Sequence, residues 1–185
     1  MDGAERQLAG FIARYSPEVA ELGGTVLAQL RNRLSQANVL VYDNYNALGA
    51  GFAPDEKAGH VILSLAFFPR WVSLFFFKGP LLDDPVGLLE GSGSTVRHVK
   101  IRRIEDFRRL EIDALIGQAL DIAEPPLDPA HTGRLVIKSI SATQRPRRPA
   151  SYAFARSIAS VTIRRASAAS PHSPTRTHFS ASRSL

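Results

Sequence analysis

The sequence predicts an α+β fold, a two-layer sandwich with helices packed on one face of a mainly antiparallel sheet of about five strands. Apolar residues recur with helical spacing within residues 8–34 and 104–122, and with strand-like patterns in between. Short polar turns join the strand segments, which favours antiparallel neighbours. Because helical segments precede and follow the strands, we expect them to share one face of the sheet.

Two helices are predicted before the first strand. One face of the first helix consists of Leu8, Phe11, Ile12 and Tyr15. Ser16 suits the N-cap of the second helix, and Pro17 suits its first position. The stripe expected to be buried in the second helix is Val19, Leu22, Val26, Leu30 and Leu34. Gly23-Gly24 in its middle is unfavourable for a helix, and such a pair is tolerable if another element packs closely there.

The middle of the chain is predicted to form strands. The strand segments are residues 39–45, 48–52, 61–67, 71–77 and 96–101. Segments 61–67 and 71–77 are apolar at nearly every residue, so we expect them at the centre of the sheet. A last helix is expected over residues 104–122, with the inner face Phe107, Leu110, Ala114, Leu115, Ala119 and Ile122. Residues 135–137 are either a short strand or an extended segment lying on the domain.

Composition divides the chain into a domain, residues 1–141, and a basic Ser, Ala and Arg-rich tail, residues 142–185, which is predicted to be disordered. The chain has 23 Lys and Arg against 17 Asp and Glu, a net charge of +6. Every acidic residue lies at or before Asp128, so the tail carries the excess positive charge and residues 1–141 are close to neutral. We therefore expect no nucleic-acid partner for the folded domain.

The sequence also indicates a cytoplasmic protein that does not enter a membrane. The absence of Cys excludes a disulfide framework, a thiolate zinc site and a Cys nucleophile. Asp2 and Glu5 stand where a signal peptide would be basic. The most apolar stretch, residues 61–77, is interrupted by Pro69-Arg70, and a bilayer span needs about 20 apolar residues.

Four stretches of the sequence together form a pattern. They are Phe11-Ile12 with Ser16-Pro17-Glu18, Val41-Tyr42-Asp43-Asn44-Tyr45, Trp71-Val72-Ser73-Leu74-Phe75-Phe76, and Leu88-Leu89-Glu90-Gly91-Ser92-Gly93 with Arg97-His98-Val99. This pattern resembles the YdhG-like domain family, a family of bacterial domains of unknown function, over residues 8–122. Its most specific part is the Leu-Leu-x-Gly-x-Gly-x-x-x-Arg-His run.

The resemblance implies a small cytosolic α+β domain similar to the frataxin sandwich, and an iron-chaperone role. Iron is therefore the one cofactor or cargo that it suggests. Frataxin-type iron binding uses an acidic ridge along the first helix and first strand. The acidic residues in this part of the chain are Glu5, Glu18, Glu21 and Asp43, and the basic ones are Arg6, Arg14, Arg31 and Arg33.

The segment around Asp43 is the first candidate site for a small ligand. In a strand, Asp43 and Tyr45 share one face, and Tyr42 lies on the other with Asn44. One interpretation is a polar patch that binds a ligand or an ion through Asp43. The other is a strand end with half-buried tyrosine rings, in which Asp43 stabilises a turn.

Two further candidate sites lie in the second half of the chain. Gly91 and Gly93, followed by Arg97, can form a backbone-amide nest for an anion, or simply a turn into a strand. His98 is a candidate metal ligand, for which His60 and Asp43 would be partners, or a structural histidine.

Arg70 and Trp71, at the start of a strand, form either a stacking surface or an anchor at the edge of the core. No residue pattern identifies a catalytic group or a specific metal site.

Three hypotheses for function follow. The first is a non-enzymatic domain that binds a small ligand or a metal in a pocket between sheet and helices. The second is an enzyme that uses Asp43, Arg97 and His98, which requires the three side chains to converge. The third is an interaction domain whose open sheet face or basic tail binds an acidic protein. We rank the first highest; the ligand or protein partner stays unidentified.

Overall fold

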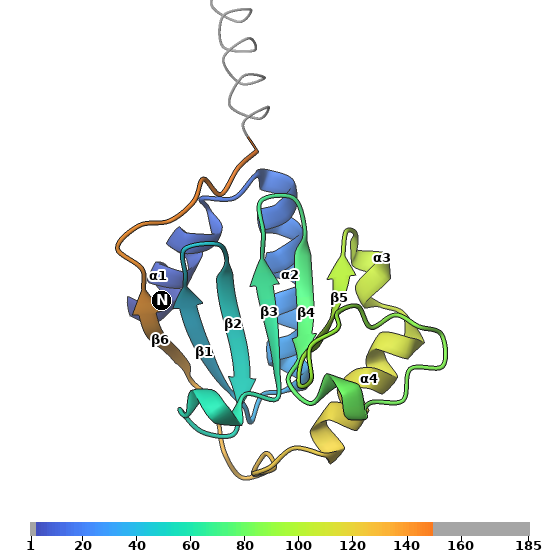
Figure 1. Cartoon of the computed structure of the whole chain (residues 1–185). Coiled ribbons are helices and arrows are strands. Elements are labelled where there is room, and N and C mark those ends of the chain that lie inside the picture. Colours follow the sequence, from blue (N-terminus) through green and yellow to red (C-terminus); the bar gives the residue numbers. More distant parts are fainter. Residues whose placement is uncertain (1–2, 150–185) are drawn as a thin grey trace, which may run out of the picture. The chain divides into compact units, whose positions relative to one another are not determined.

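A six-stranded sheet forms the centre of the fold (Figure 1). The computed structural model describes residues 3–149. The strands are β1 (Asn38–Asp43), β2 (Leu48–Ala53), β3 (Leu63–Phe67), β4 (Val72–Phe76), β5 (Arg97–Ile101) and β6 (Leu135–Ile140). Their order across the sheet is β5-β4-β3-β2-β1-β6. Neighbouring strands are antiparallel except β1 and β6, which are parallel.

The helices form the second layer. They are α1 (Gly3–Ile12), α2 (Pro17–Arg33), α3 (Ile104–Phe107) and α4 (Leu110–Asp121), with two short 3₁₀ turns, η1 (Ala58–His60) and η2 (Gly79–Leu81). In Figure 1, α1 and α2 lie together behind the sheet. This arrangement confirms the predicted α+β sandwich and adds a sixth strand to it. No helix within residues 3–149 has the length and apolar character needed to cross a membrane.

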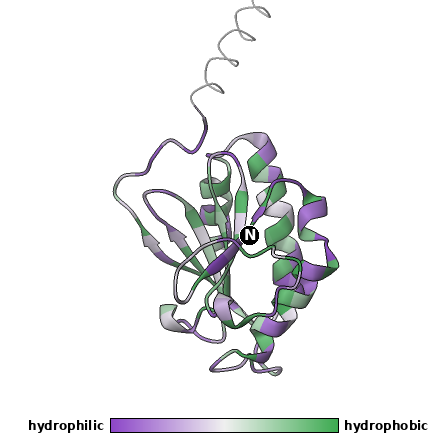
Figure 2. Cartoon of the chain, turned by 45° about the vertical axis from the view of Figure 1, so that its right-hand side comes forward, coloured by the Kyte–Doolittle hydropathy of each residue, from purple (hydrophilic) through white to green (hydrophobic). Residues whose placement is uncertain are grey.

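The core lies between the sheet and the helices. One cross-strand row on this face runs Val41, Ala50, Leu65, Leu74 and Val99. Each of these side chains is at most 7% exposed and belongs to one core cluster with residues of α2 and α4. The ribbons of the helices alternate between hydrophobic and hydrophilic residues, as expected for elements with one buried side (Figure 2).

The start and middle of α2 follow the sequence prediction. The Ser16 hydroxyl accepts a hydrogen bond from the backbone N–H of Val19 at 3.4 Å, and Pro17 is the first helical residue. Of the two glycines, Gly23 meets the condition of close packing. A Cβ at this position would lie 2.1 Å from a ring carbon of the buried Phe67 on β3, whereas a Cβ at Gly24 would meet nothing within 4 Å.

The predicted helix over residues 104–122 is wrong in one respect, because the chain breaks between α3 and α4. Leu110, expected on the inner face, is 85% exposed. The break at residues 108–109 restarts the helix at Leu110 and changes which residues face inward. The buried residues of α4 are Ile112, Leu115, Ile116 and Ala119, which have the spacing i, i+3, i+4, i+7.

The C-terminal boundary of the compact unit lies beyond the predicted position. Residues 1–149 form one unit by contact, whereas the sequence placed the boundary at residue 141. The backbone N–H of Ser141 donates to the Asp43 carbonyl at 2.9 Å, and that of Arg145 to the Tyr45 carbonyl at 2.9 Å. Arg147 is 5% exposed. Residues 150–185, for which the sequence predicts disorder, lie outside the described residues.

Tyr15, which follows α1, is hydrogen-bonded to the ends of two strands, β2 and β3. Its side chain is 1% exposed, and its hydroxyl donates to the Phe67 carbonyl at 2.9 Å. The same hydroxyl accepts from the Leu48 N–H at 3.0 Å. Burial raises the pKa of Tyr15 to about 12.

We predict opposite effects for the two adjacent glycines of α2. Gly23→Ala forces its methyl group into the Phe67 ring and should lower the free energy of unfolding by about 1–3 kcal/mol. Gly24→Ala is the matched control; it should raise this free energy by up to about 1 kcal/mol, because Ala favours a helix. Urea unfolding monitored by circular dichroism measures both, and equal effects would contradict the close packing of α2 on β3.

We also predict that Tyr15 contributes to alkaline unfolding. The folded chain keeps the Tyr15 proton up to about pH 12, whereas the unfolded chain loses it near pH 10. The contribution is therefore full below pH 10 and is lost between pH 10 and 12, by on the order of 2 kcal/mol. Tyr15→Phe should flatten this part of the stability profile, and Tyr45→Phe, at a residue that is 52% exposed, should not. Parallel alkaline limbs for the wild type and Tyr15→Phe would disprove the prediction.

Candidate functional site

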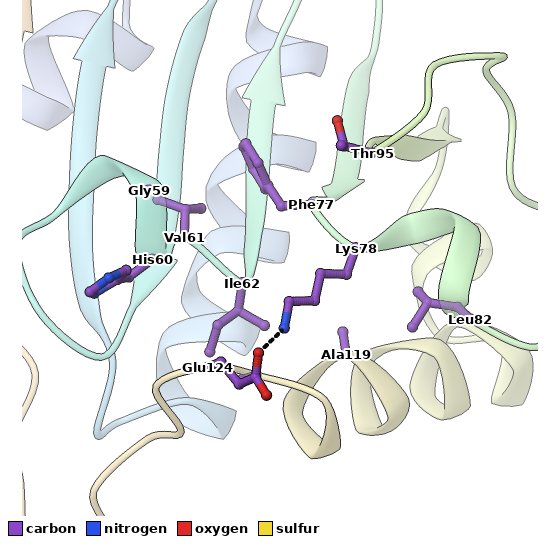
Figure 3. Close-up of a pocket in the computed structure, with 11 residues that line it drawn as sticks. Gly59, His60, Val61, Ile62, Phe77, Lys78, Leu82, Thr95, Ala119 and Glu124 are labelled. Carbon is purple, nitrogen blue, oxygen red and sulfur yellow. Dashed lines mark hydrogen bonds and ion pairs between the residues drawn. The ribbon is translucent and has the colours of Figure 1, made fainter.

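A cavity of about 260 Å³ lies at one end of the sheet, between the strands and α4 (Figure 3). Its apolar wall consists of Val61, Ile62, Phe77, Leu82, Ala119 and Ala123. Its polar lining residues are His60, Lys78, Thr95 and Glu124. The residues lie in η1 and α4 and in the segments that directly follow η1, β4, η2 and α4, together with Thr95 before β5, so only the folded chain brings them together.

The chain after β4 places Phe77 and Lys78 at this cavity. The backbone N–H of Phe77 still donates to the Ile62 carbonyl at 3.2 Å, so the chain leaves the sheet only afterwards. At Gly79 it then passes close to β5, where a Cβ would lie 2.5 Å from the Cβ of Arg97. Glycine is required for this approach. As a result, the Phe77 side chain, which is 39% exposed, and the Lys78 ammonium group both line the cavity.

Lys78 supplies the positive charge of the cavity. Its Nζ donates to the Ile122 carbonyl at 2.8 Å, at the C-terminal end of α4, where a cation is favoured. Nζ also lies 3.1 Å from Oε2 of Glu124, whose side chain is 85% exposed. Figure 3 shows the Lys78 side chain extending toward Glu124 past Ile62. Two contacts leave one of the three N–H donors of the ammonium group for a further acceptor.

His60 lines the side of the cavity formed by η1. Its Nδ1 lies 2.8 Å from Oδ2 of Asp55. The backbone N–H of Lys57 and the His60 imidazole hold the pKa of Asp55 below its usual range. No group of three His, Asp or Glu side chains able to hold a metal ion occurs within residues 3–149. The lining therefore provides an ammonium group with an exposed carboxylate partner, an imidazole, a hydroxyl and apolar walls, a combination that suits an organic ligand.

Three of the residues singled out in the sequence lie on the open face, the sheet face opposite α1 and α2. Tyr42 is in a row with Gly49, Ala66, Ser73 and Lys100 on this face. His98 follows Phe75 in the adjacent row, and their rings stack at 5.1 Å. Trp71 stacks on Phe68 at 5.6 Å.

The rings of Trp71 and His98 are connected through Phe68 and Phe75, whose centres lie 6.5 Å apart, so the structure gathers Trp71 and His98 into one aromatic cluster. Tyr42 lies on β1, with β2 and β3 between it and β4, and is not part of this cluster.

Asp43 and Tyr45 do not share a surface. Asp43 ends β1 on the helix-covered face, is 1% exposed, and contacts Arg14 at 2.8 Å and Arg147 at 2.7 Å. Tyr45 lies in the following turn and is 52% exposed. The strand ends at Asp43, so the alternation expected through Tyr45 does not apply. Asp43 is thus a buried ion-pair partner of two arginines.

Arg97, the first residue of β5, is hydrogen-bonded to the glycine-containing turn that precedes it, residues 91–96. Its Nη1 donates to the carbonyls of Gly93 and Val96, the latter at 3.0 Å. Gly91 has a φ of +112°, and the residue before it pairs with His98 across an isolated β-bridge. The guanidinium group thus binds carbonyl oxygens of the turn. Arg70 is exposed in the turn between β3 and β4.

The triad required by the enzyme hypothesis does not converge. Asp43 is on β1 and Arg97 and His98 are on β5, with β2, β3 and β4 between them. At about 4.8 Å per strand, the separation is about 19 Å. Arg97 and His98, as neighbours on one strand, also face opposite sides of the sheet.

Two of the acidic residues on the first helix and first strand are engaged with arginines. Glu5 of α1 forms an ion pair with Arg31 of α2 at 2.6 Å. Asp43 of β1 is held between Arg14 and Arg147. An acidic ridge for iron needs carboxylates with free oxygen atoms that face the same surface. The side chains of Glu5 and Asp43 do not fit this requirement.

The residues of the cavity were not identified from the sequence. Lys78-Gly79-Pro80 is typical of the end of a strand. Such a sequence does not indicate that the lysine lies beside an apolar wall. A single Lys after an aromatic run was the one available signal. The wall includes residues 61 and 123, which are far apart in the sequence, and no local pattern predicts that both line one cavity.

Comparisons with known proteins add no family to this description. No protein-family model, curated protein or solved structure matches the chain.

We predict that Gly91 is needed for the turn that positions Arg97. At a φ of +112°, Gly91→Ala should lower the free energy of unfolding by about 1–2 kcal/mol. Gly93→Ala is the control, since its Cβ would meet only a carbonyl oxygen at 3.8 Å and its backbone lies outside the left-handed region. Thermal unfolding compares the two, and an effect of Gly93→Ala as large as that of Gly91→Ala would argue against the conformational explanation.

Proposed function

We propose that the chain is a non-enzymatic domain that binds a small organic anion in the cavity beside Lys78. The observation that carries the proposal is an ammonium group at the edge of an apolar cavity of about 260 Å³. Sites for small molecules are typically concave, mostly apolar, and provided with a few polar groups that fix orientation. The ligand class that fits is a compact carboxylate with an aliphatic or aromatic body.

The apolar wall supports a ligand with a hydrophobic body. Ile62 and Leu82 are at most 9% exposed, so they give the cavity a fixed surface. Phe77 is 39% exposed and is the one aromatic ring in the lining. A ligand that covers this ring removes apolar surface from water, which contributes about 25 cal/mol per Å². A fully hydrated inorganic ion would gain nothing from these contacts.

The charge of Lys78 is available to a ligand at low cost. Its present carboxylate partner, Glu124, is 85% exposed, and exposed ion pairs contribute about 0–1 kcal/mol. A ligand carboxylate can therefore replace Glu124 beside Nζ. The hydrogen bond from Nζ to the Ile122 carbonyl holds the ammonium group in position while the carboxylates exchange.

A relationship to the YdhG-like domain family remains part of this proposal, together with a cytoplasmic location. It is supported by the residue pattern that ends at Arg97-His98-Val99 and by the agreement of the α+β fold with the expected one. Iron as a cargo has less support, because the carboxylates of Glu5 and Asp43 are paired with arginines.

The proposal is tested by thermal unfolding of the full chain with small carboxylates, their neutral amides, and inorganic phosphate. A carboxylate that binds only the folded chain should raise its stability by about 2.7 kcal/mol at a hundredfold excess over Kd. The corresponding amide should have a much smaller effect, because it lacks the charge that Lys78 attracts. Calorimetric titration then gives the affinity.

Three variants assign the site. Lys78→Met should abolish carboxylate binding, and Lys57→Met, at an exposed residue of a loop, should leave it unchanged. Glu124→Gln removes the competing carboxylate and should tighten binding severalfold without affecting the fold, since Glu124 is exposed. A carboxylate that stabilises the wild type and Lys78→Met equally would show that the cavity beside Lys78 is not the binding site.

A further inference from the structure

The arginine strap, residues 144–149, lies across the end of the domain where α1 and β1 finish. Its sequence is Gln144-Arg145-Pro146-Arg147-Arg148-Pro149. Arg148 donates to the carbonyls of residues 13, 14 and 15, at the C-terminal end of the first helix, at 3.0–3.1 Å. The Arg145 N–H donates to the Tyr45 carbonyl. The strap thus contacts residues that lie 100 or more positions earlier in the chain.

Arg147 inserts into a site that recognises its guanidinium group in three ways. Its Nη2 donates to Oδ1 of Asp43 at 2.7 Å and also to the Asn44 carbonyl. Its Cζ lies 5.6 Å from the centre of the Tyr15 ring, in the range of a cation–π interaction. A carboxylate, a carbonyl and an aromatic face together select a planar cation that donates several hydrogen bonds.

The walls of this site do not depend on the strap. Asp43 is the last residue of β1. Tyr15 is fixed by hydrogen bonds of its hydroxyl to the Phe67 carbonyl and the Leu48 N–H. These elements belong to the sheet and its helix layer. The site for the guanidinium group is therefore already shaped by the fold before Arg147 enters it.

The site requires a cation. The Asp43 side chain is 1% exposed, and Arg14, on its other oxygen, has a side chain that is 44% exposed. Removing Arg147 would leave a buried carboxylate with one partly hydrated partner, and a buried charge with an incomplete partner is unfavourable. A second arginine that enters the site would relieve this state.

Arg147 does not use the full donor capacity of a guanidinium group. Its Nε and Nη1 are buried and have no hydrogen-bond partner in the part of the chain that the structure describes. Buried donors without acceptors weaken binding. The strap stays in place because it is connected directly to β6, which gives Arg147 a high effective concentration. A free peptide with the same arginine can compete with the strap when its concentration is comparable with this effective concentration.

We propose that the Asp43–Tyr15 site is a recognition site for arginine side chains of peptides, which Arg147 occupies within the same chain. The partner that fits is the same proline-flanked arginine segment, residues 145–149, of a second copy of this chain. Proline favours the extended backbone seen in such segments and lowers the cost of ordering them. This inference is independent of the cavity beside Lys78.

The test uses the full chain and a fluorescent peptide with the sequence of residues 145–149. Arg147→Ala empties the site, so this variant should bind the peptide at least tenfold more tightly than the wild type in fluorescence anisotropy. Arg108→Ala, which changes an exposed arginine elsewhere, should behave as the wild type. The double variant Asp43→Asn, Arg147→Ala removes the carboxylate and should lose the binding.

Two outcomes would overturn the proposal. One is equal affinity of the peptide for the wild type and Arg147→Ala. The other is undiminished binding of a peptide in which citrulline replaces the middle arginine.

A second measurement does not depend on the stability of Arg147→Ala. Trypsin can cut the Arg147–Arg148 bond of the wild type only when Arg147 has left its site. Excess peptide, N-methylated at the bond between its second and third arginines so that trypsin does not cut it, should accelerate this cut severalfold relative to cuts elsewhere, as followed by mass spectrometry, and the citrulline peptide should not. An unchanged rate at a peptide excess would show that the strap is not exchangeable and would contradict the proposal.

Discussion

The close packing of α2 on β3 is the contact on which the two-layer arrangement depends. Gly23 lies directly against the Phe67 ring, and this approach determines the distance between helix and sheet at the middle of the core. Val26 and Leu30, which follow on the same side of α2, are then fully buried. The side chain of Tyr15 packs on the same Phe67 ring, with centres 5.7 Å apart, so the N-terminal helices are held at one register along the sheet.

A second constraint is the carboxylate of Asp43. It is buried where α1, β1 and the last described residues of the chain meet, and it binds one arginine from each side. Arg14 and Arg147 together compensate the buried charge. Their ion pairs explain why the compact unit extends to residue 149, although the composition of the last residues resembles that of the tail. The same carboxylate is the specificity element of the arginine site that we infer.

The two inferred sites lie at opposite ends of the sheet. The cavity beside Lys78 is next to the row that contains Phe76 and Arg97, whereas Asp43 lies in the row that contains Phe67 and Ile101. Ligands at the two sites would therefore not contact each other. Between them, the open face carries the half-buried rings of Tyr42, Trp71 and His98 on separate strands. A protein with this arrangement can respond to a small anion and to an arginine-containing peptide independently.

The sequence by itself determined the class of the fold, because the periods of apolar residues are local and survive in the structure. It gave correct predictions for the N-cap at Ser16 and for the central position of β3, whereas β4 is the second strand from one edge of the sheet. The condition of close packing that it set for the glycine pair is met at Gly23 but not at Gly24. It failed at the break between α3 and α4, since no Pro or Gly marks residues 108–109 and only packing of Ile112 and Leu115 decides the phase.

Only the tertiary structure decided the sites. The lining of the cavity joins residues 61 and 123, and the arginine site joins residues 15, 43 and 147. Their contacts depend on the order of strands and on the path of the chain after β6. Side-chain spacing in the sequence carries no information on such distances, because they result from packing between elements that are far apart in the chain.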